Sequence, residues 1–126
     1  MPVEDLRQSP MMSHLLNALD KGEDIGHYGR LTFAMIARYF VANEKLVELL
    51  AKDGDTDEQK ARALVQQVEE KDYNPPRRER ILKWQGQQDF PICPDPDDPD
   101  ACNVYNELTF PDEMYEDIQE YRKEKA

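Results

Sequence analysis

One apolar segment constrains the fold of this chain more than any other feature. Residues 30–41 read RLTFAMIARYFV and are apolar on nearly every side of a helix. A helix of this kind has to be buried around its whole circumference. We therefore expect residues 30–41 to form the central helix of one domain, because 126 residues is the length of a single domain.

Further helices are predicted on both sides of this segment. Ser9 followed by Pro10 is typical of an N-cap with proline at the first helical position, and leucines at helical spacing continue to Gly22. Other helices are expected after Asn43, from the capping-box pattern at 56–59 to about residue 72, after Pro75–Pro76, and from Phe110 onward. The sequence has no hairpin signal and no internal repeat. It predicts an all-α protein, a single compact bundle of about six helices.

The inward faces of two of these helices can be assigned from the spacing of apolar residues. The helix after Asn43 is expected to bury Leu46, Val47, Leu49 and Leu50. The helix that follows the capping box is expected to bury Ala61, Leu64, Val65 and Val68. We divide the chain into an N-terminal arm (1–8), a helical domain (9–121) and a polar C-terminal end (122–126).

An irregular Pro/Asp/Cys loop is expected before the last helix. Residues 90–103 hold four of the nine prolines and both cysteines, Cys93 and Cys102, so regular structure is excluded there. Two cysteines are half of what a four-ligand zinc or iron–sulfur site needs. A disulfide is geometrically possible but is disfavoured in a reducing cytosol. We predict buried free thiols, with a metal shared between two protomers as a minor alternative.

The charge of the chain is unevenly distributed. The net charge is −11, and residues 95–126 hold eleven acidic residues against three basic ones. Residues 71–84 hold five basic residues against two acidic ones, so one basic patch remains in an acidic protein. The sequence contains neither an apolar run of membrane-spanning length nor a signal-peptide pattern at its start, and we expect a cytoplasmic protein with no membrane partner.

Catalytic motifs are absent from the sequence. It contains no GxSxG, HExxH, P-loop or dinucleotide fingerprint, and its two histidines, His14 and His27, are too few to suggest a catalytic set. We therefore expect no enzymatic activity beyond that of an accessory subunit.

The stretch 24–30, DIGHYGR, is the strongest candidate for ligand binding. Two glycines flank His27 and Tyr28, and Arg30 follows at the expected start of the central helix. A helix start with cationic groups nearby suits a phosphate, and Arg38 lies two turns further on. Alternatively, Arg30 and Arg38 pair with surface acids and His27 is an ordinary loop residue.

Several short motifs together resemble the C-terminal domain of the large subunit of archaeal and eukaryotic DNA primase. The similarity covers most of residues 9–107. It comprises Ser9–Leu15, the Ile25–Arg30 loop with the apolar helix after it, Tyr73–Arg78, Cys93–Pro94 and Ala101–Tyr105. The resemblance implies a helical domain that acts in DNA replication and grips the phosphate-bearing end of a nucleotide or primer.

The usual members of that family hold a [4Fe–4S] cluster on four cysteines. In this chain Met11 and Arg78 occupy two of the four ligand positions, and only Cys93 and Cys102 persist. Arginine would place positive charge against the iron. We therefore expect no cofactor and a degenerate, cluster-free iron–sulfur domain.

The resemblance also implies a set of site residues. His27, Arg30 and Arg38 match positions that bind phosphate in the family, and Tyr73, Arg77, Arg78 and Arg80 are expected as auxiliary contacts. We expect a non-catalytic binding domain whose partners are single-stranded DNA, an RNA primer end or a nucleotide, together with a replication protein. The alternative is an acidic helical protein–protein interaction module, docked through its C-terminal helix, with no affinity for nucleic acid.

Overall fold

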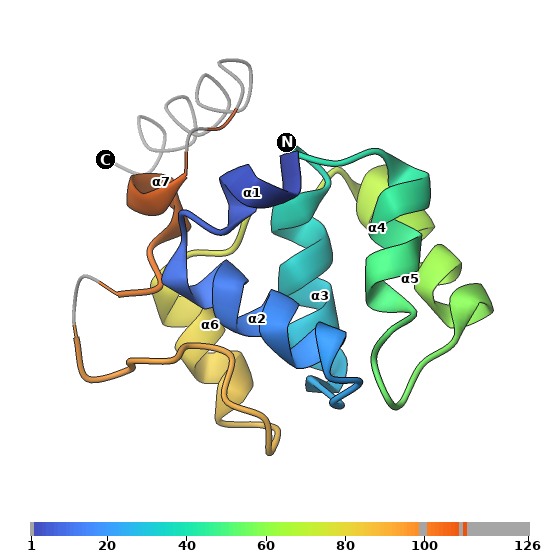
Figure 1. Cartoon of the computed structure of the whole chain (residues 1–126). Coiled ribbons are helices and arrows are strands. Elements are labelled where there is room, and N and C mark those ends of the chain that lie inside the picture. Colours follow the sequence, from blue (N-terminus) through green and yellow to red (C-terminus); the bar gives the residue numbers. More distant parts are fainter. Residues whose placement is uncertain (1, 99–100, 109, 111–126) are drawn as a thin grey trace.

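Helix α3 (Gly26–Ala37) lies at the centre of a bundle of α-helices (Figure 1). The computed structural model describes residues 2–98, 101–108 and 110. Helix α3 contacts four others: α2 (Pro10–Asp20), α4 (Asn43–Leu50), α5 (Glu58–Lys71) and α6 (Arg78–Gln85). The described residues contain no strand. The predicted all-α bundle is confirmed, and its central helix is the one expected from the apolar segment.

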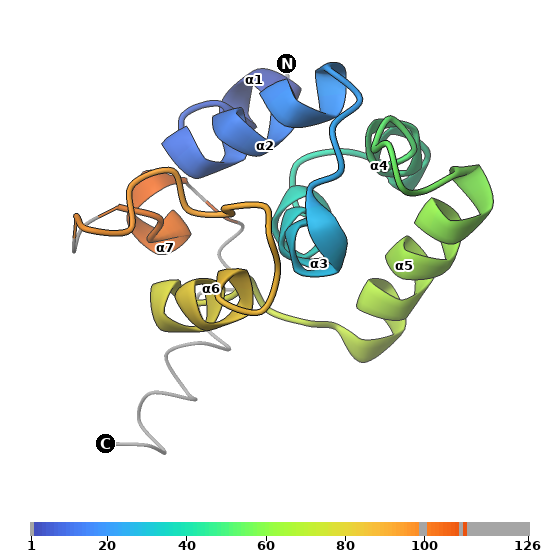
Figure 2. The ribbon, with the colours of Figure 1, turned by 90° about the horizontal axis from the view of Figure 1, so that it is seen from below.

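The remaining helices are arranged on two sides of α3. Figure 2 shows α2 and α6 on one side and α4 and α5 on the other. Two short helices, α1 (Pro2–Leu6) and α7 (Val104–Glu107), lie near α2 and complete the described part of the chain. None of the helices in these described segments is both long enough and apolar enough to span a membrane.

Helix α2 begins as the sequence predicts. Ser9 is the N-cap, its hydroxyl oxygen accepts the backbone N–H of Met12 at 3.2 Å, and Pro10 occupies the first helical position. The same hydroxyl donates to Glu107 Oε1 at 2.7 Å. The cap of α2 therefore also attaches α7, 98 residues further along the chain.

Helix α3 begins four residues before its expected start. Gly26 is its first residue and has φ +80°, a conformation that glycine adopts without steric cost. The helix ends at Ala37, so the predicted last turn is instead a series of tight turns. The core of α3 is fully buried: Phe33, Ala34, Ile36 and Ala37 have no exposed surface.

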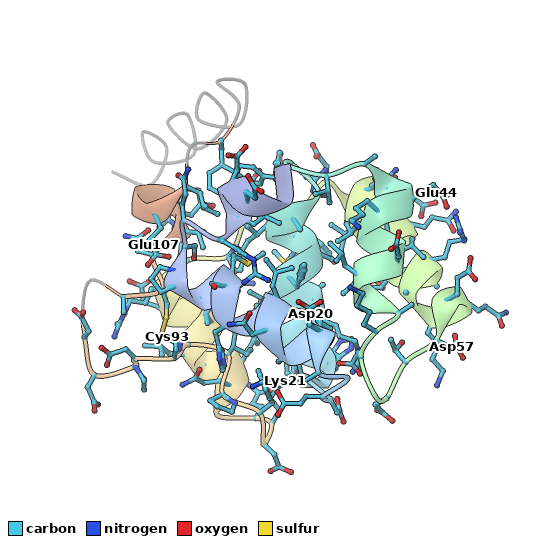
Figure 3. The ribbon with its side chains drawn as sticks, viewed as in Figure 1. Asp20, Lys21, Glu44, Asp57, Cys93 and Glu107 are labelled. Carbon is cyan, nitrogen blue, oxygen red and sulfur yellow. A yellow bond between two sulfur atoms is a disulfide. The ribbon has the colours of Figure 1, made fainter. Side chains whose placement is uncertain are left out.

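The helices on the other side of α3 match their predicted faces. All four apolar residues expected inside from α4 are buried. In α5, Ala61, Val65 and Val68 are buried and Leu64 is partly buried. The cap of α5 differs from the prediction: Asp57, rather than Thr56, accepts the backbone N–H of Lys60 at 2.8 Å. Figure 3 shows Asp57 and Glu44 at the outer side of this helix pair.

The cysteine loop is irregular, as predicted, but its cysteines are not free thiols. Cys93 and Cys102 form a disulfide with their Cα atoms 5.8 Å apart. The prediction of burial is confirmed, since both residues are at most 1% exposed, and the prediction of free thiols is wrong. A disulfide was geometrically possible, but the expected redox environment disfavoured it; the turns of the loop place the two cysteines at bonding distance.

The structure describes most of the predicted N-terminal arm but not the predicted C-terminal end. The predicted N-terminal arm contains α1, and Leu6 at the end of that helix is fully buried in the core. The helix predicted from Phe110 and the polar end at 122–126 lie outside the described residues. The domain limits given above remain predictions.

Candidate anion-binding site

Arg30 near the start of α3 is engaged inside the protein. Its Nη1 donates to Asp24 Oδ1 and to Asp53 Oδ1, both at 3.1 Å. The Asp53 side chain is completely buried, and the Arg30 side chain is 14% exposed. Asp53 belongs to the turn that follows α4. The Arg30 charge is therefore balanced by a carboxylate that the sequence analysis did not identify.

The backbone N–H groups at the start of α3 are also occupied. The N–H of Ile25 donates to Asp53 Oδ2 at 2.8 Å, and that of Gly26 donates to Asp24 Oδ1 at 2.9 Å. The N–H of Tyr28 donates to Gln88 Oε1 at 2.9 Å. Free N–H groups at a helix start are what bind an anion, and here side chains of the protein satisfy these three.

Arg38 lies at the opposite end of α3, where it is the C-cap residue. Its Nη2 donates to Asp72 Oδ1 and to the carbonyl oxygen of Tyr73, both at 2.8 Å. Its side chain is 12% exposed. Arg38 therefore holds the connection between α5 and α6, and within the described part of the chain it shares no hydrogen-bond partner with Arg30.

His27 is exposed and makes an edge-on ring contact with Tyr28, with centroids 5.3 Å apart. Because Arg30 and Arg38 are engaged at opposite ends of α3, the structure does not bring these three predicted phosphate ligands into one cluster. The alternative stated above, that these arginines pair with surface acids, agrees with the Arg38–Asp72 and Arg30–Asp24 pairs, whereas the second partner of Arg30, Asp53, is buried.

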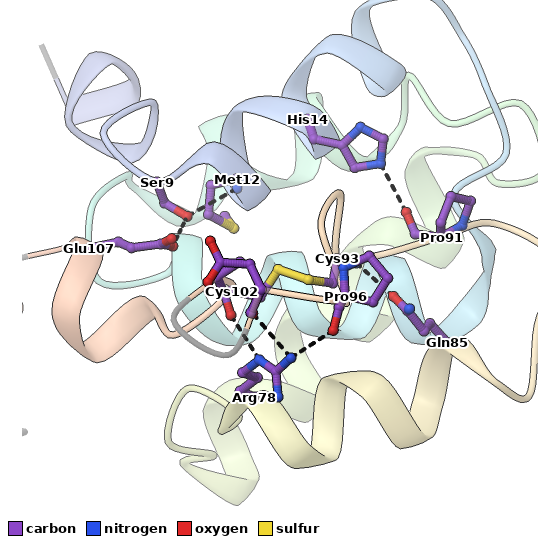
Figure 4. Close-up of a disulfide and its surroundings, with 12 residues drawn as sticks. Ser9, Met12, His14, Arg78, Gln85, Pro91, Cys93, Pro96, Cys102 and Glu107 are labelled. Carbon is purple, nitrogen blue, oxygen red and sulfur yellow. Dashed lines mark hydrogen bonds between the residues drawn. A yellow bond between two sulfur atoms is a disulfide. The ribbon is translucent and has the colours of Figure 1, made fainter.

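Arg78 organises the cysteine loop (Figure 4). Its Nε donates to the carbonyl oxygen of Ala101 at 3.1 Å. Its Nη2 donates to the carbonyl oxygens of Pro96 at 2.8 Å and Asp98 at 3.2 Å. This guanidinium, at the first residue of α6, therefore binds backbone oxygens on both sides of the loop.

The other auxiliary residues come together at a surface hollow of about 500 Å³. We call it the basic hollow and define it by Tyr73, Arg77, Glu79, Arg80, Lys83 and Tyr105. Met35, Pro75 and Pro76 also line it and supply apolar surface. Three of the predicted site residues, Tyr73, Arg77 and Arg80, are thus assembled in one place.

The basic hollow has an excess of positive charge. Arg77, Arg80 and Lys83 follow one another at three-residue steps, which places them along one side of α6 and its N-cap. Glu79 is the single acidic residue among those that line the hollow in the described part of the chain. The lining therefore contributes a formal charge of +2 to a protein of net charge −11.

Aromatic rings adjoin these cations. The Arg80 guanidinium carbon lies 5.9 Å from the centroid of the Trp84 ring, and Trp84 stacks on Tyr28 with centroids 5.5 Å apart. The Tyr105 hydroxyl donates to the carbonyl oxygen of Pro75, which joins α7 to the segment before α6. Arginine next to aromatic rings is a combination found where proteins bind single-stranded nucleic acid.

Three residues that define the basic hollow, Glu79, Lys83 and Tyr105, were not assigned to the site from the sequence. Lys83 continues the three-residue spacing of Arg77 and Arg80, so that periodicity could have identified it. Tyr105 lies 30 residues from its partner Pro75. No local pattern signals that contact.

The residues expected at the family's cluster ligand positions do not fit a metal cluster. Both cysteine sulfurs are joined in a disulfide, so neither is a thiolate, and the Arg78 guanidinium is bonded to the loop. Met11 is buried in the apolar core. Across residues 2–98, 101–108 and 110, no group of three or more His, Cys, Asp or Glu side chains is placed to hold a metal ion.

Fold and site together define a helical protein with a basic, aromatic-lined hollow. Comparison with protein-family models, with curated proteins and with solved structures finds no match to this chain.

Proposed function

We propose that this chain is a non-catalytic accessory domain that binds the phosphate-bearing end of a nucleotide, primer or single strand in the basic hollow. The observation that carries the proposal is the convergence of Arg77, Arg80 and Lys83 with two tyrosines around one hollow. Its volume of about 500 Å³ falls within the range of sites for small ligands. The proposed ligand, one terminal nucleotide, is a small ligand of the kind that such sites hold.

In this proposal some residues of the hollow bind phosphate and others stack on the base. Arg80 and Lys83 supply positive charge to the phosphate groups, with Arg77 beside them. Tyr73, which is partly exposed, offers a ring against which a base can stack. His27 adds an exposed imidazole near the Tyr28 and Trp84 stack. Arg30, Arg38 and Arg78 act indirectly, by holding the elements that surround the hollow.

The acidic character of the whole chain bears on affinity. With a net charge of −11, long-range repulsion opposes the approach of a polyanion. Binding should therefore be weak, strongly salt-dependent, and strengthened by a basic partner. The resemblance to the primase large subunit supports the same ligand class and a replication partner.

Fluorescence anisotropy tests this proposal. A labelled single strand with a 5′-triphosphate is compared with the same strand ending in a 5′-hydroxyl, at low and at moderate salt. We expect tighter binding of the triphosphate and a loss of about tenfold or more in the Arg80→Glu/Lys83→Glu variant. Lys60→Glu, on an exposed position of α5, is the matched control and should bind within about twofold of the wild type.

An acidic protein–protein interaction module is the second candidate function. The eleven acidic residues between Asp95 and Ala126 favour it, although its predicted docking helix lies outside the described residues. Absence of binding to either strand would overturn the nucleotide-end proposal. Salt-sensitive association with a basic protein would then favour the interaction module.

A further inference from the structure

We propose that the basic hollow is completed only when the Cys93–Cys102 disulfide forms, so that oxidation during folding creates the binding site. The inference concerns regulation of the site in the proposed function and rests on that function for its binding readout. The contacts of the described residues support the other half of the proposal, that the walls of the hollow depend on the disulfide.

The first contact runs from the loop to α6. The disulfide closes the loop between residues 93 and 102, and the Arg78 guanidinium donates to the carbonyl oxygens of Pro96, Asp98 and Ala101 within it. Arg78 is flanked in sequence by Arg77, which lines the hollow. The closed loop therefore positions the end of α6 from which the cations of the hollow extend.

The same helix meets the loop at its other end. The backbone N–H of Cys93 donates to Gln85 Oε1 at 2.7 Å, and Gln85 is the last residue of α6. Arg80 and Lys83 lie between these two attachments. The loop thus contacts α6 at its first and last residues, on either side of the two cations.

The second wall of the hollow depends on Cys102. Asn103 directly follows it and caps α7, accepting the backbone N–H of Tyr105 at 3.2 Å. The Tyr105 hydroxyl then donates to Pro75. Without the disulfide, the prolines of the loop favour extended backbone. Non-covalent contacts such as the Ser9–Glu107 hydrogen bond then have to hold α7, and with it Tyr105, in place.

Formation of the Cys93–Cys102 disulfide needs an oxidant, which we take to be a small-molecule disulfide. The two thiols together lose two protons and two electrons as the bond between their sulfurs forms. The sulfur–sulfur bond of the small disulfide breaks, and it leaves as two thiols. In the folded protein both cysteines are at most 1% exposed. An attacking thiolate cannot reach them, so the bond resists reduction once folding is complete.

The experiment compares three preparations of the full chain. The first is oxidised and native, the second is that protein treated with a small dithiol without denaturant, and the third is unfolded, reduced and refolded with the dithiol present. Each is examined by free-thiol titration, by amide hydrogen exchange in α6 and α5, and by anisotropy with the 5′-triphosphate strand.

We expect the first two preparations to have no free thiol and to bind equally. The third should have two free thiols, at least about tenfold faster exchange in α6 with α5 unchanged, and at least about tenfold weaker binding. Equal exchange in α6 and equal binding in all three would overturn the inference. Rapid reduction of the second preparation would overturn the shielding of the bond.

A second variant, Arg78→Ala, tests the inference if the reduced chain does not fold. It keeps the disulfide but removes the hydrogen bonds that join α6 to the loop. Faster exchange in α6 and weakened binding are expected for this variant, and wild-type behaviour in both would overturn the inference. If the oxidised wild type binds no triphosphate strand, the proposed function fails. Thiol titration and hydrogen exchange then still decide whether the disulfide positions α6.

Discussion

Arg30 Nη1 lies 3.1 Å from Asp53 Oδ1, and this contact joins the start of α3 to the turn after α4. The other oxygen of the same carboxylate accepts the backbone N–H of Ile25, and Oδ1 also accepts that of Asp55 at 2.7 Å. A buried carboxylate is stable only when its charge is compensated and its oxygens are hydrogen-bonded. Asp53 satisfies both conditions.

Asp53→Ala should therefore destabilise the protein strongly. Among the described residues, it leaves the Arg30 guanidinium, 14% exposed, with Asp24 as its remaining acidic partner. We expect a loss of about 3–5 kcal/mol in the free energy of unfolding, measured by urea denaturation. Asp24→Ala is the control, because that side chain is 54% exposed, and it should cost no more than about 1 kcal/mol. Equal effects of the two substitutions would contradict the structure.

Gly26→Ala tests the backbone at the first residue of α3. Gly26 has φ +80°, and an added Cβ would lie 2.4 Å from Gln88 Oε1. The Gln88 side chain would have to move and lose its hydrogen bonds to Tyr28 and Ile25. We expect a destabilisation of about 1–3 kcal/mol in thermal or urea unfolding.

Gly86→Ala provides the matched comparison for this substitution. Gly86 follows α6 in a right-handed helical conformation, and a Cβ there would lie 3.4 Å from its nearest neighbour, the Lys83 carbonyl oxygen. Its unfolding free energy should change by less than about 1 kcal/mol. If Gly26→Ala lowers the free energy of unfolding by no more than Gly86→Ala does, the positive φ at Gly26 is wrong.

Ser9→Ala should weaken two helices at once. The substitution removes the cap of α2 and the hydroxyl that binds Glu107. We expect a loss of about 1–2 kcal/mol in stability, together with faster hydrogen exchange in α7. Ser13→Ala removes a hydroxyl that accepts only from the exposed Arg7 in the described residues, and it should leave α7 exchange unchanged. A normal rate in α7 for Ser9→Ala would refute the long-range link.

The Glu44 and Arg62 pair predicts a local pH dependence. Hydrogen bonds from Arg62 at 2.7 and 3.1 Å, followed by the attraction of its charge, lower the pKa of the Glu44 carboxyl below its usual 4.5. Because the pKa is lowered in the folded state, the pair contributes stability above the unfolded-state pKa. That contribution is lost as the pH falls through the folded-state pKa.

An NMR titration of the Glu44 carboxyl carbon measures this shift directly. The midpoint should lie below 4.5 in the wild type and rise in Arg62→Gln. Glu44→Gln should remove the corresponding acid dependence of stability. An Arg62→Gln midpoint identical to that of the wild type would show that the two side chains do not pair in solution.

Much of the fold was predictable because its signals are local and periodic. The Ser9 and Pro10 start of α2, and the faces of α4 and α5, follow from the spacing of caps and apolar residues. Part of the candidate site was predictable for the same reason. Tyr73, Arg77 and Arg80 lie within one short basic stretch, and α6 with its N-cap Arg77 places Arg77 and Arg80 along one side.

The remaining features depend on contacts between distant residues. The sequence by itself determined that the chain is helical, that residues 30–41 supply its centre and that one basic patch survives in an acidic protein. Only the tertiary structure decided that Arg30 pairs with Asp53, that Tyr105 closes the basic hollow onto Pro75, and that Cys93 and Cys102 form a disulfide. Side-chain partners of this kind are selected by packing and burial, because a charge or thiol bonds to whatever group the folded chain places within reach.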